Sequence, residues 1–378
     1  MPIIIAWIIL TVFGILSMYS VSIHESFTTT LKLIANGDRI GDPSNYFYFL
    51  KQVKNILFSL IAAGVAYAIP IKFFQNNKNI TIMAVILMVL QLLVFVPSIS
   101  ATYNGARGWI DIPLLPSIQP AEFFKLGYIL FLWWWLMRKR DKVNTKDFFI
   151  SFVILNALIF FVFLLIPDLG TVMILGIVGL IMCRYAGAKI KYIMRILFWG
   201  LAAGLVMWGI AGMVSDRFAY IQKRFTYFIS SNVDPQARQI GRQNQQALLA
   251  IGGGWLLGKW YGKWLQKFWF IPEAQSDFIF AAFSEEIGFL GNMILLSFYL
   301  FIAYYFLTHL RNVKDDHKKI IGIGILSLIL VQAFVNIWVN VKILPSTWLT
   351  LPFISYGWTA LMVNFVEIII LYKILQKK

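Results

Sequence analysis

The feature that most constrains this chain is a series of about ten apolar stretches, each close to the ~20 residues that an α-helix needs to cross a bilayer. Turn-forming or charged residues separate the stretches, which lie near 3–23, 53–71, 79–97, 119–137, 148–166, 168–186, 192–213, 278–308, 320–342 and 351–373. The sequence therefore predicts an all-α polytopic membrane protein with about ten transmembrane helices, in a single transmembrane domain over residues 1–378.

The composition agrees with that prediction. Hydrophobic residues make up 60% of the chain and charged residues 13%, against about 45–50% and about 25% in soluble domains. A soluble fold of this length could not bury so much apolar surface. The single cysteine, Cys183, excludes a disulfide framework, and the three scattered histidines suggest no metal site. The first stretch has no basic segment before it and no cleavage site after it, so we expect a retained span.

The distribution of Lys and Arg predicts the orientation of the chain. If both termini are cytoplasmic, as an even number of spans requires, the cytoplasmic loops and C-terminus carry 18 of these residues and the short loops opposite carry six. Cytoplasmic loops are enriched in Lys and Arg. Membrane topology therefore accounts for the net charge of +16, and we expect no nucleic acid as a partner.

One long polar connection interrupts the apolar pattern, at about residues 214–277, on the predicted extracytoplasmic side. It is basic, rich in Gln and Trp, and contains the run Gly252-Gly253-Gly254. A loop of this length is usually functional or disordered. Because indole rings prefer the membrane interface, its tryptophans favour a segment that lies at the membrane surface.

Charged residues near or inside the predicted spans need a partner or a function, because charge in the bilayer costs free energy. Glu122 and Lys125 are three residues apart and share one helix face, as an ion pair or as groups that contact a substrate. Glu285 and Glu286 are adjacent and point about 100° apart, which argues against a paired-carboxylate acid and base. We expect one of these glutamates to pair with a basic group, for which Lys125 is a candidate.

Two aspartates lie at predicted helix starts. Asp168 follows Pro167 at the start of the sixth span, where it could cap the helix and meet its positive dipole end, or take part in a site. Asp277 lies in IPEAQSDFIFAAF, where the long loop meets an apolar helix. It could be a simple cap or a general base whose pKa is raised by partial desolvation. Position alone favours the cap.

Four segments together resemble one protein family. They are GARGWIDIPLLPSIQPAEFFK (Gly105–Lys125), PDLGT (Pro167–Thr171), the run from GRQNQQALLAIGGGWLLGKW to IPEAQSDFIFAAFSEEIGFLG (Gly241–Gly291), and LPSTWLTLPFISYG (Leu344–Gly357). In this order and at these spacings the chain resembles the SEDS family, the FtsW, RodA and SpoVE proteins of bacterial wall synthesis. The resemblance extends from about the second to the tenth span.

The resemblance implies a membrane peptidoglycan glycosyltransferase. Such proteins polymerise lipid II, the undecaprenyl-linked disaccharide-pentapeptide, into glycan strands at the outer face of the bacterial cytoplasmic membrane, with inversion at the sugar. It also implies partners in the membrane: a class B penicillin-binding protein that crosslinks the strands, and other proteins of the divisome or elongasome.

The same resemblance implies roles for individual residues. The family's essential acid, in a P-E-x-x-x-D-F motif, falls on Asp277, which is then the general base. Residues expected to bind the substrate, several of them in further motifs, are Arg107, Trp109, Asp168, Gln243, Gln246, Lys259, Glu273 and Ser355. Glu122, Lys125, Glu285 and Glu286 are expected to form ion pairs or to support the site.

The departing diphosphate needs positive charge beside it. Arg107, Arg242 or Lys259 could supply this charge. A divalent cation, Mg or Mn, could share the task, although the sequence contains no dedicated ligand cluster and we predict no protein metal site.

The sequence departs from the family pattern at four tryptophans. Trp348 and Trp358 stand where the family usually has glycine, and Trp255 and Trp260 replace small residues in a glycine-rich stretch. Glycine permits unusual backbone angles, so these changes leave the local loop geometry open. The dipeptide Gln266-Lys267 favours a division-type member slightly.

Two other functions compete with the enzyme. A flippase for the lipid-linked precursor should have polar groups that continue through the midplane to both faces, whereas here the polar loop and the acid gather on one side. A scaffold of the division or elongation machinery would leave Asp277 dispensable. The sequence favours the enzyme over both.

Overall fold

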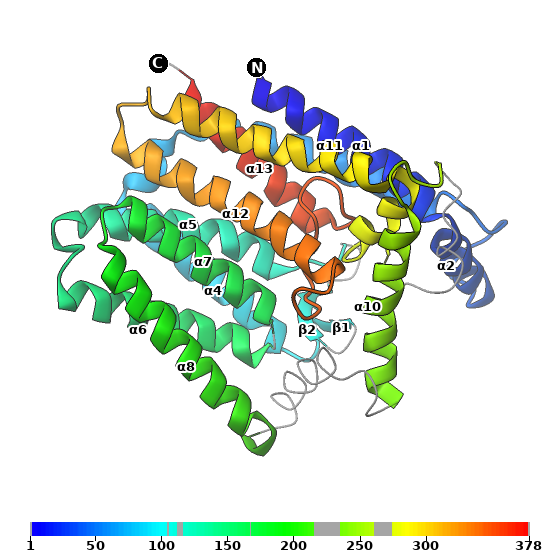
Figure 1. The fold of residues 1–378 in the computed structure, drawn as a ribbon, viewed down its shortest axis with the longest axis horizontal. Helices are drawn as coiled ribbons and strands as arrows, with labels where there is room; N and C mark the ends of the chain where they lie inside the picture. The colour runs from blue at the N-terminus through cyan, green and yellow to red at the C-terminus, as the bar shows by residue number, and fades with distance from the viewer. Residues whose placement is uncertain are drawn as a thin grey trace. The chain divides into compact units, whose positions relative to one another are not determined.

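The computed structural model describes residues 2–103, 106–111, 116–166, 168–214, 235–260 and 274–376; at 102, 103, 106, 107, 203, 205–214 and 235–242 it describes only the backbone. The helices are α1 (Pro2–Val21), α2 (Ile23–Ala35), α3 (Phe47–Ala68), α4 (Asn77–Leu92), α5 (Pro120–Arg138), α6 (Lys146–Leu165), α7 (Leu169–Tyr185), α8 (Ile190–Val214), α10 (Pro235–Gly253), α11 (Ile279–Leu310), α12 (Asp316–Asn340) and α13 (Trp358–Leu375). Three short 3-10 turns, η1 (Ile71–Gln75), η2 (Leu93–Phe95) and η3 (Arg140–Lys142), and two strands, β1 (Ser100–Tyr103) and β2 (Ala106–Ile110), complete the described elements (Figure 1).

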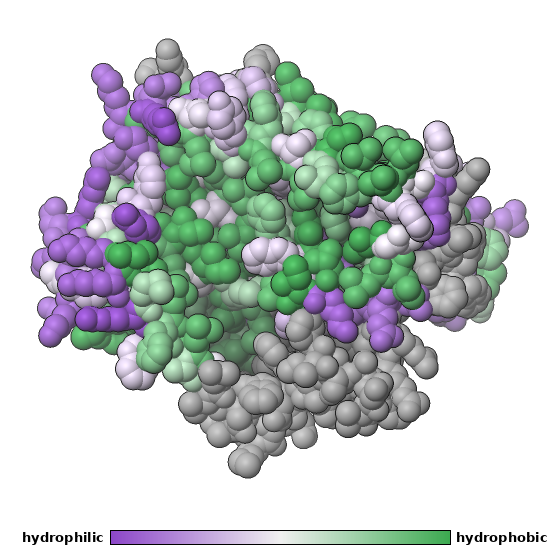
Figure 2. Space-filling model, viewed as in Figure 1, coloured by the Kyte–Doolittle hydropathy of each residue, from purple (hydrophilic) through white to green (hydrophobic). Residues whose placement is uncertain are grey.

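The prediction of an all-α polytopic membrane protein is confirmed. Each of the ten predicted spans overlaps one helix: α1, α3, α4, α5, α6, α7, α8, α11, α12 and α13. Within the described residues, seven helices are long and apolar enough to cross a membrane, and α7 is a shorter apolar helix. Hydrophobic residues cover much of the face shown in Figure 2, and hydrophilic residues gather in patches at its edges.

Backbone contacts divide the chain into two compact units. Unit 1 contains α1, α2, most of α3, α10, α11 up to His309, the end of α12 from Gln332, and α13 up to Tyr372. Unit 2 contains the elements from η1 to α8 and α12 up to Val331.

Three local features differ from the sequence prediction. Helix α13 begins at Trp358, because residues 351–357 form a turn whose buried side chains are apolar enough to resemble the start of a span. The long connection contains α10, a helix whose low hydrophobicity hid it from a search for spans. A short antiparallel hairpin pairs Ala101 of β1 with Trp109 of β2.

Small residues control the packing of unit 2. Helix α5 contacts α4 and α7, and α7 also contacts α6 and α8. At Gly179 of α7, a Cβ atom would lie 2.5 Å from the hydroxyl of Tyr128 on α5, so the glycine leaves room for that side chain. The Tyr128 hydroxyl donates a hydrogen bond to Asn156 Oδ1 of α6 at 2.6 Å, which links α5 and α6 through buried polar groups.

In unit 1, alanines let α10 approach the start of α11. One buried cluster combines Ala247 and Ala250 of α10 with Phe278 and with Ala281 and Ala282 of α11. Side chains this small permit close contact between helix backbones. This packing places the helix that carries Gln243 and Gln246 against the turn that contains Asp277.

Candidate functional site

Asp277 lies in the turn at residues 274–278, directly before α11, and is half-buried. The backbone on both sides of it is held by other segments of unit 1. Ser276 O accepts a hydrogen bond from Ser355 Oγ at 2.6 Å. Asp277 O accepts two hydrogen bonds from α12, from Asn336 Nδ2 and Asn340 Nδ2, each at 2.9 Å. The position of the predicted base is therefore set by tertiary contacts.

The segment LPSTWLTLPFISYG folds against several helices of unit 1. Tyr299 of α11 donates a hydrogen bond to Pro352 O at 2.5 Å. A Cβ on Gly14 of α1 would lie 2.8 Å from Ile354 Cα, so the helix and this segment are in close backbone contact. Ser355 is buried, and its hydroxyl accepts from Leu351 N at 2.7 Å while donating to Ser276.

These contacts bear on the role of Ser355. A hydroxyl has a single hydrogen to donate, and Ser276 O receives it. Direct binding of substrate by Ser355 stays a prediction, but the geometry favours support of the turn that carries Asp277.

Helix α11 is two helices joined at Gly288, whose φ of 65° and ψ of −169° lie outside the helical region. The part after the break, from Phe289 to Leu310, is about 33 Å long at about 1.5 Å per residue, close to the ~30 Å of a bilayer core. The predicted span at 278–308 is therefore too long at its N-terminal end. The first turns of α11, which follow Asp277, form a separate short helix.

The segment Gly254–Lys259 fills this break. Three main-chain hydrogen bonds join the two: Phe289 N to Trp255 O at 2.8 Å, Leu290 N to Leu256 O at 3.1 Å, and Lys259 N to Glu285 O at 2.9 Å. They satisfy backbone groups that a broken helix leaves without intrahelical partners. A Cβ on Gly254, Gly258 or Gly288 would overlap main-chain atoms of the opposite segment.

The structure resolves the question that the unusual tryptophans raised. Trp255 and Trp260 have φ values of 47° and 75°, in the left-handed region that favours glycine. Trp348 and Trp358 are not among the described residues with positive φ. Only the two tryptophans of the long connection therefore occupy positions with a backbone reason for a small residue.

Glu285 and Glu286 point to different partners, in agreement with their spacing. Glu285 Oε1 lies 2.6 Å from Lys259 Nζ, and Glu286 Oε1 accepts a hydrogen bond from the hydroxyl of Ser20 on α1. Both glutamates are buried. The basic partner that the structure gives Glu285 is Lys259, whereas the sequence suggested Lys125. The two acids thus fasten the Gly254–Lys259 segment and α1 to the first part of α11.

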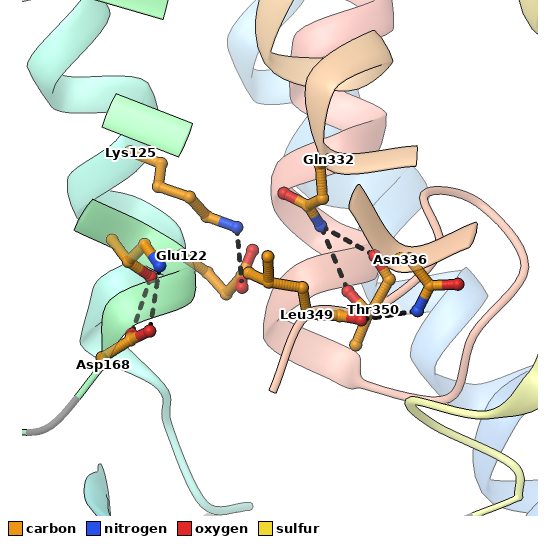
Figure 3. A network of polar contacts seen from close by, with 8 residues as sticks. Glu122, Lys125, Asp168, Gln332, Asn336, Leu349 and Thr350 are labelled. Carbon is orange, nitrogen blue, oxygen red and sulfur yellow. Dashed lines mark hydrogen bonds and ion pairs between the residues drawn. The ribbon is translucent and has the colours of Figure 1, made fainter. Parts of the chain in front are cut away.

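Glu122 and Lys125 form a buried ion pair in unit 2. Lys125 Nζ lies 2.9 Å from Glu122 Oε1, and the side chains are 1% and 3% exposed for Lys125 and Glu122 (Figure 3). Their spacing on α5 places them on one face. Burying a pair this deeply costs desolvation free energy, which offsets much of the attraction between the two charges.

We expect the Lys125→Met substitution to lower the free energy of unfolding by about 3 kcal/mol, because it leaves the Glu122 carboxylate buried without this cation. The double substitution Glu122→Gln, Lys125→Met is expected to recover much of that loss. Thermal unfolding in detergent measures both effects. An exposed pair of the same unit, Arg140 and Asp316, provides the control: Arg140→Met should change stability by less than about 1 kcal/mol. Equal stability of Lys125→Met and wild type would contradict this interpretation.

Asp168 caps α7. Its Oδ1 accepts from Thr171 N at 2.9 Å and its Oδ2 accepts from Thr171 Oγ1 at 2.7 Å (Figure 3). This is the capping arrangement that satisfies a free N–H of the first helical turn. Both oxygens serve this cap, so a further role in substrate binding stays a prediction.

The remaining predicted site residues fall into three groups. Gln243 and Gln246 are half-buried on α10, in unit 1. Trp109 is half-buried in β2, in unit 2. The side chains of Arg107 and Arg242, and all of Glu273, Gln266 and Lys267, lie outside the described residues. Among the residues that are described, no group of three or more His, Cys, Asp or Glu side chains is arranged to hold a metal ion.

Helix α12 carries a row of amides that was not predicted from the sequence. Gln332, Asn336 and Asn340 are buried and four residues apart, so they lie on one face of the helix. Their spacing inside an apolar span is a signal that could have identified them, because polar residues in a membrane helix mark packing or function. Glu367, a buried acid in α13, was missed in the same way.

Known proteins of the family that the motifs predicted are similar to this chain over most of its length. Residues 1–378 match the family model described as FtsW, RodA and SpoVE cell cycle proteins. Stage V sporulation protein E of Bacillus subtilis (strain 168) is 34% identical over 324 residues, which are 83% of this chain and 83% of the relative. The probable peptidoglycan glycosyltransferase FtsW of Alcanivorax borkumensis is 31% identical over 338 residues, 87% of this chain and 83% of the relative.

The fold is also that of a solved structure. A chain of the structure titled "Structural coordination of polymerization and crosslinking by a peptidoglycan synthase complex" superposes with a TM-score of 0.72 at 19% identity, covering 100% of this chain and 98% of that one. The family resemblance is thus confirmed by sequence over the whole chain. This chain belongs to the FtsW/RodA/SpoVE family, the SEDS proteins.

Proposed function

We propose that this protein is a peptidoglycan glycosyltransferase that polymerises lipid II into glycan strands, with Asp277 as the general base. Relatives that are 31% identical carry the name of this activity. The observation that carries the proposal is the setting of Asp277, a half-buried acid in the family's motif, whose backbone is held by hydrogen bonds from α12 and from the segment Leu344–Gly357.

In the proposed reaction, the Asp277 carboxylate takes the proton of a sugar hydroxyl as that oxygen attacks the anomeric carbon of the second substrate. The new carbon–oxygen bond forms while the bond to the diphosphate breaks, and the diphosphate leaves with the bonding electrons. Attack from the opposite face inverts the anomeric carbon, and no covalent intermediate with the enzyme is needed.

Positive charge beside the diphosphate would stabilise its departure. We assign this task to Arg107 and Arg242, with Lys259 as a third candidate. Lys259 Nζ is 2.6 Å from Glu285 Oε1, and an ammonium group has three hydrogens to donate, so this ion pair leaves it capable of a second contact. Its side chain is 35% exposed, which fits access from outside the helix bundle.

We infer that both termini face the cytoplasm of a bacterial cell and that Asp277 faces the opposite side of the cytoplasmic membrane. The excess of Lys and Arg in the loops assigned to the cytoplasm supports this orientation. Lipid II that has crossed the membrane would then reach the carboxylate from the outer leaflet.

We also propose a class B penicillin-binding protein as the partner, together with other membrane proteins of the divisome or elongasome. The shared fold with a chain from a complex that coordinates polymerisation and crosslinking supports this assignment. The family resemblance supports it as well, because it implies a class B penicillin-binding protein that crosslinks the new strands.

Labelled lipid II and the purified protein in detergent, with and without the class B partner, test the activity. We expect glycan polymer in gels, at least when the partner is present. A parallel experiment in vesicles measures transport of labelled lipid II across the bilayer. Transport without any polymer would overturn the glycosyltransferase and favour a flippase; neither activity, with lipid II binding absent, would favour a scaffold.

A further inference from the structure

The amide row of α12, which consists of Gln332, Asn336 and Asn340, is the most organised polar feature of unit 1. The three residues are 2%, 2% and 0% exposed. Amide side chains that are this deeply buried need hydrogen-bond partners within the protein, because an unsatisfied buried polar group costs free energy. Their partners therefore show what this face of α12 holds in place.

The amide row holds two separate segments of the chain. Gln332 Nε2 donates to Thr350 O at 3.1 Å, and Asn336 Nδ2 donates to Leu349 O at 2.7 Å (Figure 3). Asn336 Nδ2 also donates to Asp277 O, as does Asn340 Nδ2, each at 2.9 Å. One end of the row thus fastens the segment Leu344–Gly357, and the other end fastens the predicted catalytic turn.

The hydrogen bonds around Asp277 fix both peptide groups that flank its Cα atom. The preceding peptide is held at Ser276 O by Ser355 Oγ, and the following one at Asp277 O by Asn336 and Asn340. Each peptide group is planar, so fixing two successive planes fixes the direction of the Cα–Cβ bond between them. The carboxylate then keeps only its side-chain rotations.

Asn340 has a second function at the same place. Its Oδ1 accepts a hydrogen bond from Ala281 N at 3.0 Å. An N–H of the first helical turn is ordinarily satisfied by the side chain at the N-cap. Here the residue before the helix is Phe278, which has no oxygen in its side chain, and α12 supplies the acceptor instead. Asn340 therefore holds the carbonyl of Asp277 with its Nδ2 and the start of α11 with its Oδ1.

We propose that Asn336, Asn340 and Ser355 are positioning residues that hold the Asp277 carboxylate in the position and orientation that its reaction requires. This inference rests on the proposed function of Asp277. The three residues act through the backbone and do not touch the reacting atoms. A displacement of about 1 Å in a catalytic group can cost about 100-fold in rate, so loss of the two asparagine contacts should appear mainly in kcat.

The decisive variants remove the amide donors and keep a similar side-chain volume: Asn336→Leu, Asn340→Leu and the pair combined. Each single variant leaves one donor on Asp277 O, so we expect a loss of kcat of about three- to tenfold, and about 100-fold for the double variant. KM for lipid II is expected to stay within about threefold. The pH dependence of kcat should also change, because the carboxylate moves into different surroundings.

Gln332→Met is the matched control. It removes a buried amide from the same helix face and breaks its hydrogen bonds to Thr350 O and Oγ1, whereas Asp277 O is held by Asn336 and Asn340. Its thermal stability should fall about as much as that of Asn336→Leu, while kcat per folded molecule stays within twofold of wild type. A general packing effect would lower kcat in this control as well, and that result would overturn the proposal.

Ser355→Ala separates positioning from direct substrate binding. A positioning role predicts a lower kcat with KM little changed, whereas a direct contact with lipid II predicts a higher KM.

Asp277→Asn, measured in the same assay, tests the proposed base separately from the proposed positioning residues. If Asp277→Asn retains wild-type activity, the proposed base is wrong and the hydrogen bonds from Asn336, Asn340 and Ser355 have no catalytic role. If Asp277→Asn is inactive but the double asparagine variant has wild-type kcat and pH profile, only the positioning proposal fails.

Discussion

Replacing Asp277 by asparagine is expected to reduce the rate of lipid II polymerisation by about 1,000-fold. Asparagine has nearly the same shape but cannot accept the proton of the attacking hydroxyl, and general base catalysis contributes about 100- to 10,000-fold. The backbone contacts of the turn involve main-chain atoms of residue 277, so they do not depend on the carboxylate. Folding and lipid II binding should therefore remain intact.

The measurement is the initial rate of polymer formation with the class B partner present, alongside lipid II binding and thermal unfolding. Asp141→Asn provides a matched control, because Asp141 is an exposed acid in η3 and should tolerate the change without loss of rate. Polymer at the wild-type rate from Asp277→Asn would show that the acid is not the base. A loss of lipid II binding together with activity would assign Asp277 to substrate binding.

Replacing Gly288 by alanine is expected to destabilise the protein by about 4 kcal/mol. The combination of φ 65° and ψ −169° is essentially restricted to glycine and costs another residue about 1–3 kcal/mol. The new methyl group would also meet backbone atoms of the segment Gly254–Lys259, with Leu256 O 2.8 Å away. Overpacking of this kind costs a further ~1–3 kcal/mol.

Thermal unfolding in detergent tests this prediction, and Gly64→Ala is the control. Gly64 lies within α3, where an added Cβ atom would meet no neighbouring group within 4 Å, and it is not among the glycines with positive φ. Alanine at this position should be neutral or stabilising by up to about 1 kcal/mol. Similar melting temperatures for Gly288→Ala and wild type would mean that the break in α11 is not a required feature of the fold.

The transmembrane architecture could be predicted because the bilayer imposes a length on each apolar helix. That constraint is local, so the span at 148–166 predicts α6 (Lys146–Leu165) within two residues. Prediction from hydrophobic length is wrong where an apolar segment does not cross the membrane. Residues 351–357 and the apolar residues that begin α11 resemble the start of a span, yet the first form a buried turn and the second belong to a separate short helix.

The candidate site was predicted less completely than the spans. The sequence motifs pointed to Asp277, and the spacing of Glu122 and Lys125 placed them on one helix face. No local pattern could show that Glu285 pairs with Lys259, since 26 residues separate them along the chain. The contacts of Asn336 and Asn340 with Asp277 span 59 and 63 residues, and only the packing of α12 creates them.

By itself, the sequence determined that this chain is a polytopic membrane protein of the SEDS family, because hydrophobic length and short motifs are properties of contiguous residues. Only the tertiary structure decided how Asp277 is held, where α11 breaks, and which partners the buried acids have. The physical reason is that buried polar groups must find hydrogen-bond partners inside the protein. The packing of the helices determines which partners are within reach, and no single segment of the sequence contains that information.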